Sequence, residues 1–108
     1  MYLSFFIVSC FNCNDYYEKE IRPLKINGEL KKKNRDKNNN GIPRLVIGNN
    51  DKNAIITLYD YEASGLWEFI QIGDIVKKEE GSLTFNIYRK GMNYTDIFSF
   101  DIKCKDGY

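Results

Sequence analysis

The stretch Ser-Leu-Thr-Phe-Asn-Ile-Tyr-Arg at residues 82–89 indicates the fold class, because its apolar and polar side chains alternate. Leu83, Phe85 and Ile87 fall on one side of an extended chain, and the residues between them fall on the other. The stretch Asp96 to Cys104 repeats this pattern. A period of two is typical of antiparallel strands with one buried face. The two stretches therefore predict a sheet.

Four further segments have the length and apolar content of strands: Leu24 to Lys33, Arg44 to Ile47, Ala54 to Asp60 and Ile75 to Lys78. Segments rich in Asn and Gly separate several of the strands and predict hairpin connections, at Asn34 to Gly41, Gly48 to Asn53 and Lys90 to Asn93. Between the third and fourth strands, Ser64 can cap a short helix in which Leu66, Phe69 and Ile70 share one face.

We therefore expect an all-β fold, either a small antiparallel barrel or a rolled sheet of five to six strands with one short helix. A helix between the third and fourth strands also occurs in OB-type barrels, so an OB-type barrel is one of the folds that the sequence allows. A chain of 108 residues is long enough for one small domain. Its net charge of +1 provides no global attraction to nucleic acid or to anionic membranes.

The amino terminus has an uncharged apolar run, Tyr2 to Ser9, directly before Cys10. The run is too short to span a bilayer, which takes about 20 residues. Ile7-Val8-Ser9-Cys10 is similar to the lipobox of bacterial lipoprotein signals. Ile72 to Lys78, with its Gly73-Asp74 turn, resembles a phrase in short uncharacterised bacterial envelope lipoproteins.

This resemblance implies lipidation of Cys10 and attachment to a membrane of the cell envelope through a lipid anchor. The predicted organisation is then a signal segment at residues 1–9, a tether at 10–20 and a single small β-barrel domain at 21–108. The alternative is that residues 5–8 form a buried first strand.

The chain has three cysteines, Cys10, Cys13 and Cys104. Lipidation of Cys10 would leave Cys13 and Cys104 as a candidate disulfide, with Cys104 as a small buried strand residue being the alternative. Zinc or redox chemistry at Cys10 and Cys13 is weakly supported, because the chain has no His and no second Cys pair.

A basic run is the candidate anion contact of this sequence, and it comprises Lys31, Lys32, Lys33, Arg35 and Lys37. The alternative is an exposed hairpin kept soluble by its charge. Asp36 to Gly41 also matches the opening of a calcium loop, but Ile47 stands where the bidentate Glu would be required. We therefore expect no metal site and no cofactor.

The sequence favours a protein that is not an enzyme, because without His it has no imidazole base, and its acidic residues fall in turns and loops. We expect a lipid-anchored cell-envelope protein that acts as a non-catalytic binding or structural module, with a protein as a candidate partner and nucleic acid disfavoured. The alternatives are an intracellular small β-barrel that binds nucleic acid or protein, and an inhibitor or immunity-type protein.

Overall fold

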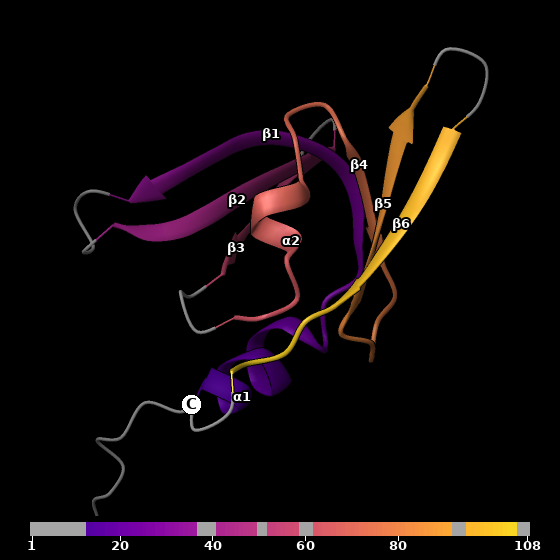
Figure 1. The fold of residues 1–108 in the computed structure, drawn as a ribbon. Coiled ribbons are helices and arrows are strands. Elements are labelled where there is room, and N and C mark those ends of the chain that lie inside the picture. Colours follow the sequence, from indigo (N-terminus) through magenta and orange to yellow (C-terminus); the bar gives the residue numbers. More distant parts are fainter. Residues whose placement is uncertain (1–12, 37–40, 50–51, 59–61, 92–94, 106–108) are drawn as a thin grey trace, which may run out of the picture.

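The structure is a computed structural model, and it describes residues 13–36, 41–49, 52–58, 62–91 and 95–105. Six antiparallel strands form one sheet, with a short helix between the third and fourth strands (Figure 1). In chain order the elements are α1 (Cys13–Tyr16), the π-helical turn η2 (Tyr17–Ile21), β1 (Ile26–Asp36), β2 (Ile42–Asn49), β3 (Lys52–Thr57), α2 (Leu66–Phe69), β4 (Ile75–Lys78), β5 (Thr84–Lys90) and β6 (Thr95–Asp101).

The strand order is β3-β2-β1-β4-β5-β6, so β1 lies at the centre. Its first residues, Ile26 to Glu29, pair with β4, and the rest of the strand pairs with β2. A bulge between Leu30 and Lys32 lies where the partner changes, and bulges bend strands. Figure 1 shows β1 arching over α2, with β2 and β3 on one side and β4 to β6 on the other.

The sheet is rolled and not closed, because β3 and β6 stand at its two edges and do not pair in the described part of the chain. The all-β prediction of a rolled sheet with one short helix is confirmed. The closed barrel, and with it the OB-type barrel, is not the arrangement that the structure shows.

A close approach of two glycines allows the bend. A Cβ atom added at Gly28 would lie 2.7 Å from the carbonyl oxygen of Gly48, which is closer than a real Cβ atom comes to another atom. The first half of β1 therefore passes this close to the end of β2 only because Gly28 has no side chain, whereas a Cβ atom at Gly48 would meet Asn53 and Lys31 instead.

The core lies inside the roll, under α2. Leu66 and Ile70 are buried at the two ends of this helix. The ring of Phe69 packs against Phe98 and Phe100 of β6, with ring centroids 4.7 and 5.0 Å apart. The inward positions of the strands supply the rest of the core, including Leu30, Leu45, Ile56, Val76, Phe85 and Ile87.

The segment at residues 13–21 is helical and is part of the domain. Cys13, Tyr17 and Ile21 recur at intervals of four residues, and all three are buried in the core. The predicted tether at residues 10–20 is thus too long, because from Cys13 onward the chain packs against the sheet domain. Residues 10–12, like the predicted signal segment 1–9, lie outside the described residues.

The strand at the carboxyl end is shorter than predicted. The alternating pattern extends to Cys104, but β6 ends at Asp101. Beyond β6, the backbone of Lys103 and Cys104 pairs with the segment before α2. The amide of Ala63 donates to the carbonyl of Lys103 at 2.8 Å, and Cys104 and Glu62 form an isolated antiparallel β-bridge.

Candidate functional site

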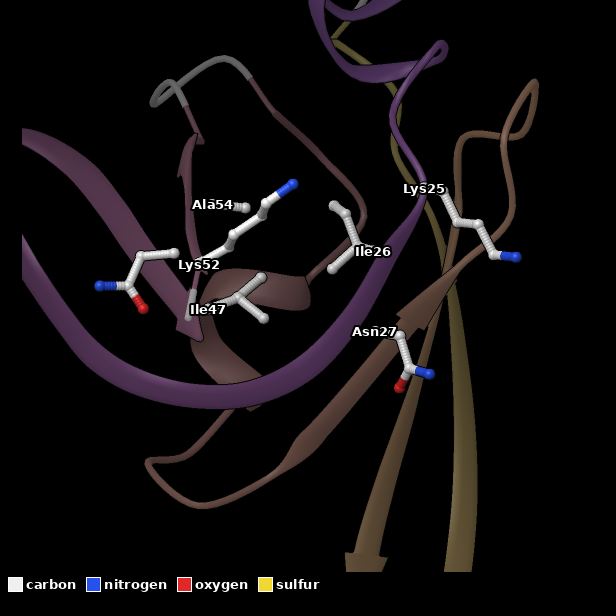
Figure 2. Close-up of a pocket in the computed structure, with 7 residues that line it drawn as sticks. Lys25, Ile26, Asn27, Ile47, Lys52 and Ala54 are labelled. Atoms are coloured by element: carbon white, nitrogen blue, oxygen red, sulfur yellow. The ribbon is translucent and has the colours of Figure 1, made fainter. Parts of the chain in front are cut away.

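An open pocket of about 370 Å³ lies between the start of β1 and the edge strand β3. Its floor consists of the core residues Ile26 and Ile47 together with Ala54. Figure 2 shows Lys52 extending over this floor toward Ile26, whereas Lys25 and Asn27 point away from it. The full lining is Lys25, Ile26, Asn27, Ile47, Lys52, Asn53 and Ala54.

The chemistry of this lining suits binding. An apolar floor lined by two lysines and two asparagines can hold an apolar group and orient an anionic or polar one. The lining holds no carboxylate, hydroxyl or thiol, and its titratable side chains are the two lysines.

A disulfide joins Cys13 of α1 to Cys104, and the Cα atoms of the two residues are 6.1 Å apart. The pairing predicted from the cysteine count is therefore present in the structure. The two cysteines are separated by 91 positions, so the bond joins the beginning and the end of the described chain.

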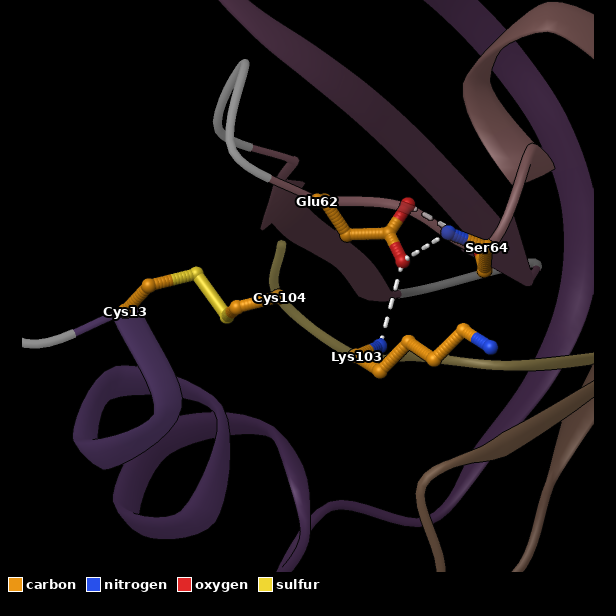
Figure 3. Close-up of a disulfide and its surroundings, with 5 residues drawn as sticks. All are labelled: Cys13, Glu62, Ser64, Lys103 and Cys104. Carbon is orange, nitrogen blue, oxygen red and sulfur yellow. Dashed lines mark hydrogen bonds between the residues drawn. A yellow bond between two sulfur atoms is a disulfide. The ribbon is translucent and has the colours of Figure 1, made fainter. Parts of the chain in front are cut away.

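Glu62 organises the backbone beside this disulfide (Figure 3). Its carboxylate accepts hydrogen bonds from the amide of Ser64 at 2.6 Å, from the Ser64 hydroxyl at 2.8 Å and from the amide of Lys103 at 3.1 Å. The Ser64 oxygen in turn accepts from the amide of Leu66 at 3.1 Å, but the N-cap residue of α2 is Gly65 and not Ser64 as predicted. Glu62 thereby fixes the chain before α2 to the chain after β6.

The predicted anion-contact residues lie on different faces of β1. Lys33 and Arg35 face α2, where both cations lie over the ring of Trp67, at 5.0 and 5.8 Å from its centroid. Lys33 also donates to the carbonyl of Ile70 at 3.0 Å, and Arg35 donates to that of Gly41 at 2.9 Å.

The remaining basic residues of this run point elsewhere. Lys31 lies at the bulge, 3.7 Å from the carboxylate of Glu29, and Lys32 is exposed beside Val46 on the outer face. Lys37 lies outside the described residues. The structure thus does not gather the described part of the run into one basic surface, and it uses Lys33 and Arg35 to pack α2 against β1.

Two buried charged groups were not predicted. Lys78 on β4 is 1% exposed, and its ammonium donates to the carbonyls of Ser82, Glu79 and Arg22 at 2.7, 2.8 and 3.2 Å. Burial is the main cause that lowers the pKa of Lys78, and the nearby Arg22 guanidinium lowers it further, against the carboxylates of Glu79 and Glu80. We call this arrangement the Lys78 cage.

The second group is an ion pair between Asp74, which is 4% exposed, and Arg89 of β5. Arg89 donates to both carboxylate oxygens, at 2.9 and 2.6 Å, and to the carbonyl of Phe69 at 2.9 Å, while its guanidinium lies 4.2 Å from the centre of the Phe69 ring. Burial alone would raise the pKa of Asp74, but the hydrogen bonds from Arg89 and from the Gln71 amide outweigh it, so the pKa is lowered.

A weak sequence signal existed for Lys78 but not for the Asp74–Arg89 pair. Lys78 stands two positions after Val76 on the inward side of β4, where a lysine is unusual. Gly73-Asp74 was interpreted only as a turn, and the partner of Asp74 is 15 residues away, which no local pattern reveals.

Two predictions fall mainly or wholly outside the described residues. These are the lipobox with Cys10 and the rejected calcium loop, of which residues 37–40 are not described. Within the described ranges, no group of three or more His, Cys, Asp or Glu side chains is placed to hold a metal ion. Nor is any helix in those ranges both long and apolar enough to cross a membrane.

The comparisons of this chain with known proteins found no match. No protein-family model matches it, and neither the curated proteins nor the solved structures contain a match.

Proposed function

We propose that this protein is a lipid-anchored cell-envelope protein whose rolled sheet is a non-catalytic binding or structural module. The anchor is a lipid on Cys10, and the module is the domain that begins at Cys13.

The disulfide between Cys13 and Cys104 is the observation that carries this proposal. Disulfides persist in oxidising compartments such as the bacterial envelope, whereas cytosolic thiols are kept reduced. Closing a loop of 91 positions stabilises a fold by about 4 to 5 kcal/mol in the chain-entropy model. A small domain in the envelope benefits from such a bond, because its core alone provides a modest margin of stability.

The position of the disulfide also fits an anchor on Cys10. Cys13 is the third residue after Cys10, and three residues span at most about 11 Å. Because Cys13 is bonded to Cys104, a lipid at Cys10 would hold the folded domain at its disulfide end, close to the membrane surface.

The binding role is supported by the open pocket between β1 and β3. Its floor is apolar, its lining has no carboxylate, hydroxyl or thiol, and the cation of Lys52 lies over the floor. These features are typical of a site that holds a ligand without transforming it.

The test is expression of the full chain from its own start codon in a bacterium with lipoprotein processing, followed by intact mass and membrane partition. We expect loss of residues 1–9, an acyl mass on Cys10 and recovery in the membrane fraction. Cys10→Ser should remain unprocessed. The matched control Cys104→Ser should still be processed and acylated, because it removes only the disulfide.

An unprocessed wild-type chain that stays out of the membrane fraction would contradict the proposal. The intracellular binding module would then become the leading interpretation, and an unpaired Cys13 in the same mass spectrum would support it.

A further inference from the structure

We propose that the pocket between β1 and β3 binds a small amphipathic anion, namely a short alkyl chain that carries one carboxylate. This inference rests on the binding role proposed above and names the class of ligand for that site. It does not depend on the lipid anchor, so the anchor and the ligand class can fail separately.

The pocket owes its space to a small side chain on the inward side of β3. Ala54 pairs with Ile47 of β2 and is only partly buried. The next inward position of β3 is Ile56, which is fully buried opposite Leu45. The pocket thus lies where a side chain as large as Ile56 would fill the space in front of Ile47. An alkyl group placed there covers apolar surface that the domain leaves open.

A single cation extends over this space. Lys52 lies two positions before Ala54, on the same side of β3, and its side chain reaches over the floor toward Ile26 (Figure 2). Within the described ranges, no hydrogen bond or ion pair engages the ammonium of Lys52, and the described lining holds no carboxylate. The apolar floor therefore has an uncompensated positive charge at its rim.

These two features select the charge and the size of the ligand. A carboxylate can pair with Lys52 while its alkyl chain covers the floor, whereas a cation of the same length is repelled. The volume of about 370 Å³ is near the lower limit of ligand pockets, which favours a short chain. For a ligand of about eight non-hydrogen atoms we expect a dissociation constant on the order of 1 mM.

The test is a titration with hexanoate of the full-length chain, in a Cys10→Ser background that keeps lipid out of the measurement. The backbone amide chemical shifts measured by NMR report binding. We expect saturable shifts centred on the residues that line the pocket. Hexylamine is the matched probe, because it has the same alkyl length and is a cation at neutral pH. It should bind about fivefold more weakly than hexanoate.

Two substitutions test the cation and the floor. Lys52→Gln should weaken hexanoate binding about threefold and remove the preference over hexylamine. The control Lys25→Gln should leave binding nearly unchanged, because Lys25 lines the pocket but points away from its floor. Ala54→Leu should abolish binding by filling the pocket. Its control Ile55→Leu should not, because Ile55 is 52% exposed on the other side of β3.

The outcomes separate the ligand class from the binding role. Absence of saturable shifts at the pocket with hexanoate overturns the inference. Equal effects of Lys52→Gln and Lys25→Gln, or unchanged binding in an Ala54→Leu chain that thermal unfolding shows to be folded, overturn it as well. Equal affinity for the two probes, lost in Ala54→Leu, overturns the anionic class and keeps the binding role. The processing of Cys10 is unaffected by any of these results.

Discussion

The Lys78 cage and the Asp74–Arg89 pair are two ways of holding a cation inside the same half of the sheet. The cage surrounds an ammonium with three backbone carbonyls, and the pair matches a guanidinium to one carboxylate and one carbonyl. The cage joins the end of the amino-terminal helical segment to the turn between β4 and β5. The pair joins the turn after α2 to β5.

The difference is in where the partners come from. Backbone carbonyls are present whatever the side chains are, so the cage depends on the path of the chain and on one lysine. The pair depends on two particular side chains. When either one is removed, the other stays in place without a counter-charge. The directions of the pKa shifts reflect this difference. Burial lowers the pKa of Lys78, which has no carboxylate bonded to it in the cage, whereas the hydrogen bond to Asp74 raises the pKa of Arg89.

The largest effect is expected for Asp74→Ala. It leaves Arg89 partly buried without its carboxylate, and we expect the free energy of unfolding to fall by about 3 kcal/mol. Urea unfolding measures this value. The control Asp101→Ala removes an exposed carboxylate that accepts from Thr84 and should cost less than about 1 kcal/mol. A loss for Asp74→Ala no larger than that of the control would show that the pair contributes nothing.

A smaller effect is expected for Lys78→Met, which keeps the length of the side chain and removes the donors. The carbonyl oxygens of the cage then lose a hydrogen bond while they stay largely out of water, at a cost of about 2 kcal/mol. Lys77→Met is the matched control, because Lys77 is the exposed neighbour on β4; it removes the contact of its ammonium with the Tyr88 ring, 4.8 Å away, and should cost less than about 1 kcal/mol. The same urea series compares the two variants, and equal values would remove the cage from the list of stabilising interactions.

The smallest effect is on how the free energy of unfolding depends on pH at acidic pH. It distinguishes the Asp74–Arg89 pair from the Lys78 cage. The folded pKa of Asp74 lies below its ordinary value of 3.8, so its contribution is fully present above that pH. The contribution is lost as pH falls through the folded pKa. Lys78 keeps its proton over the whole of that range. Unfolding free energies measured from pH 5 downward should therefore fall less steeply in Asp74→Ala than in wild type, whereas Lys78→Met should keep the wild-type slope. Parallel slopes for wild type and Asp74→Ala would contradict this assignment.

The comparison also shows which parts of the fold are encoded locally. Residues 82–89 alternate, and the strand they predicted is β5. Alternation depends on one face of the sheet being buried, and this can be recognised in a single segment. The charged second half of β1 has no such pattern, so the prediction ended at Lys33, three residues before the strand ends at Asp36.

Features that depend on distant partners were harder to predict. The roll is open because β3 and β6 do not meet, and no short segment encodes that. Residues 10–20 were predicted as a tether because of their polar and charged side chains, and the four-residue spacing of Cys13, Tyr17 and Ile21 was not used. At the candidate sites, the cysteine count predicted the disulfide. The pocket was not predicted, because it forms where β1 and β3 approach each other.

The disulfide has a further consequence for how the protein tolerates proteases. Cys13 and Cys104 close nearly all of the described chain into a covalent ring. One cut anywhere inside that ring, for example in an exposed loop, opens the ring but leaves both pieces attached to each other. A second cut releases the fragment between the two cuts, and the pieces that carry Cys13 and Cys104 separate only when the disulfide is reduced, so a single nick leaves one molecule of unchanged composition apart from an added water.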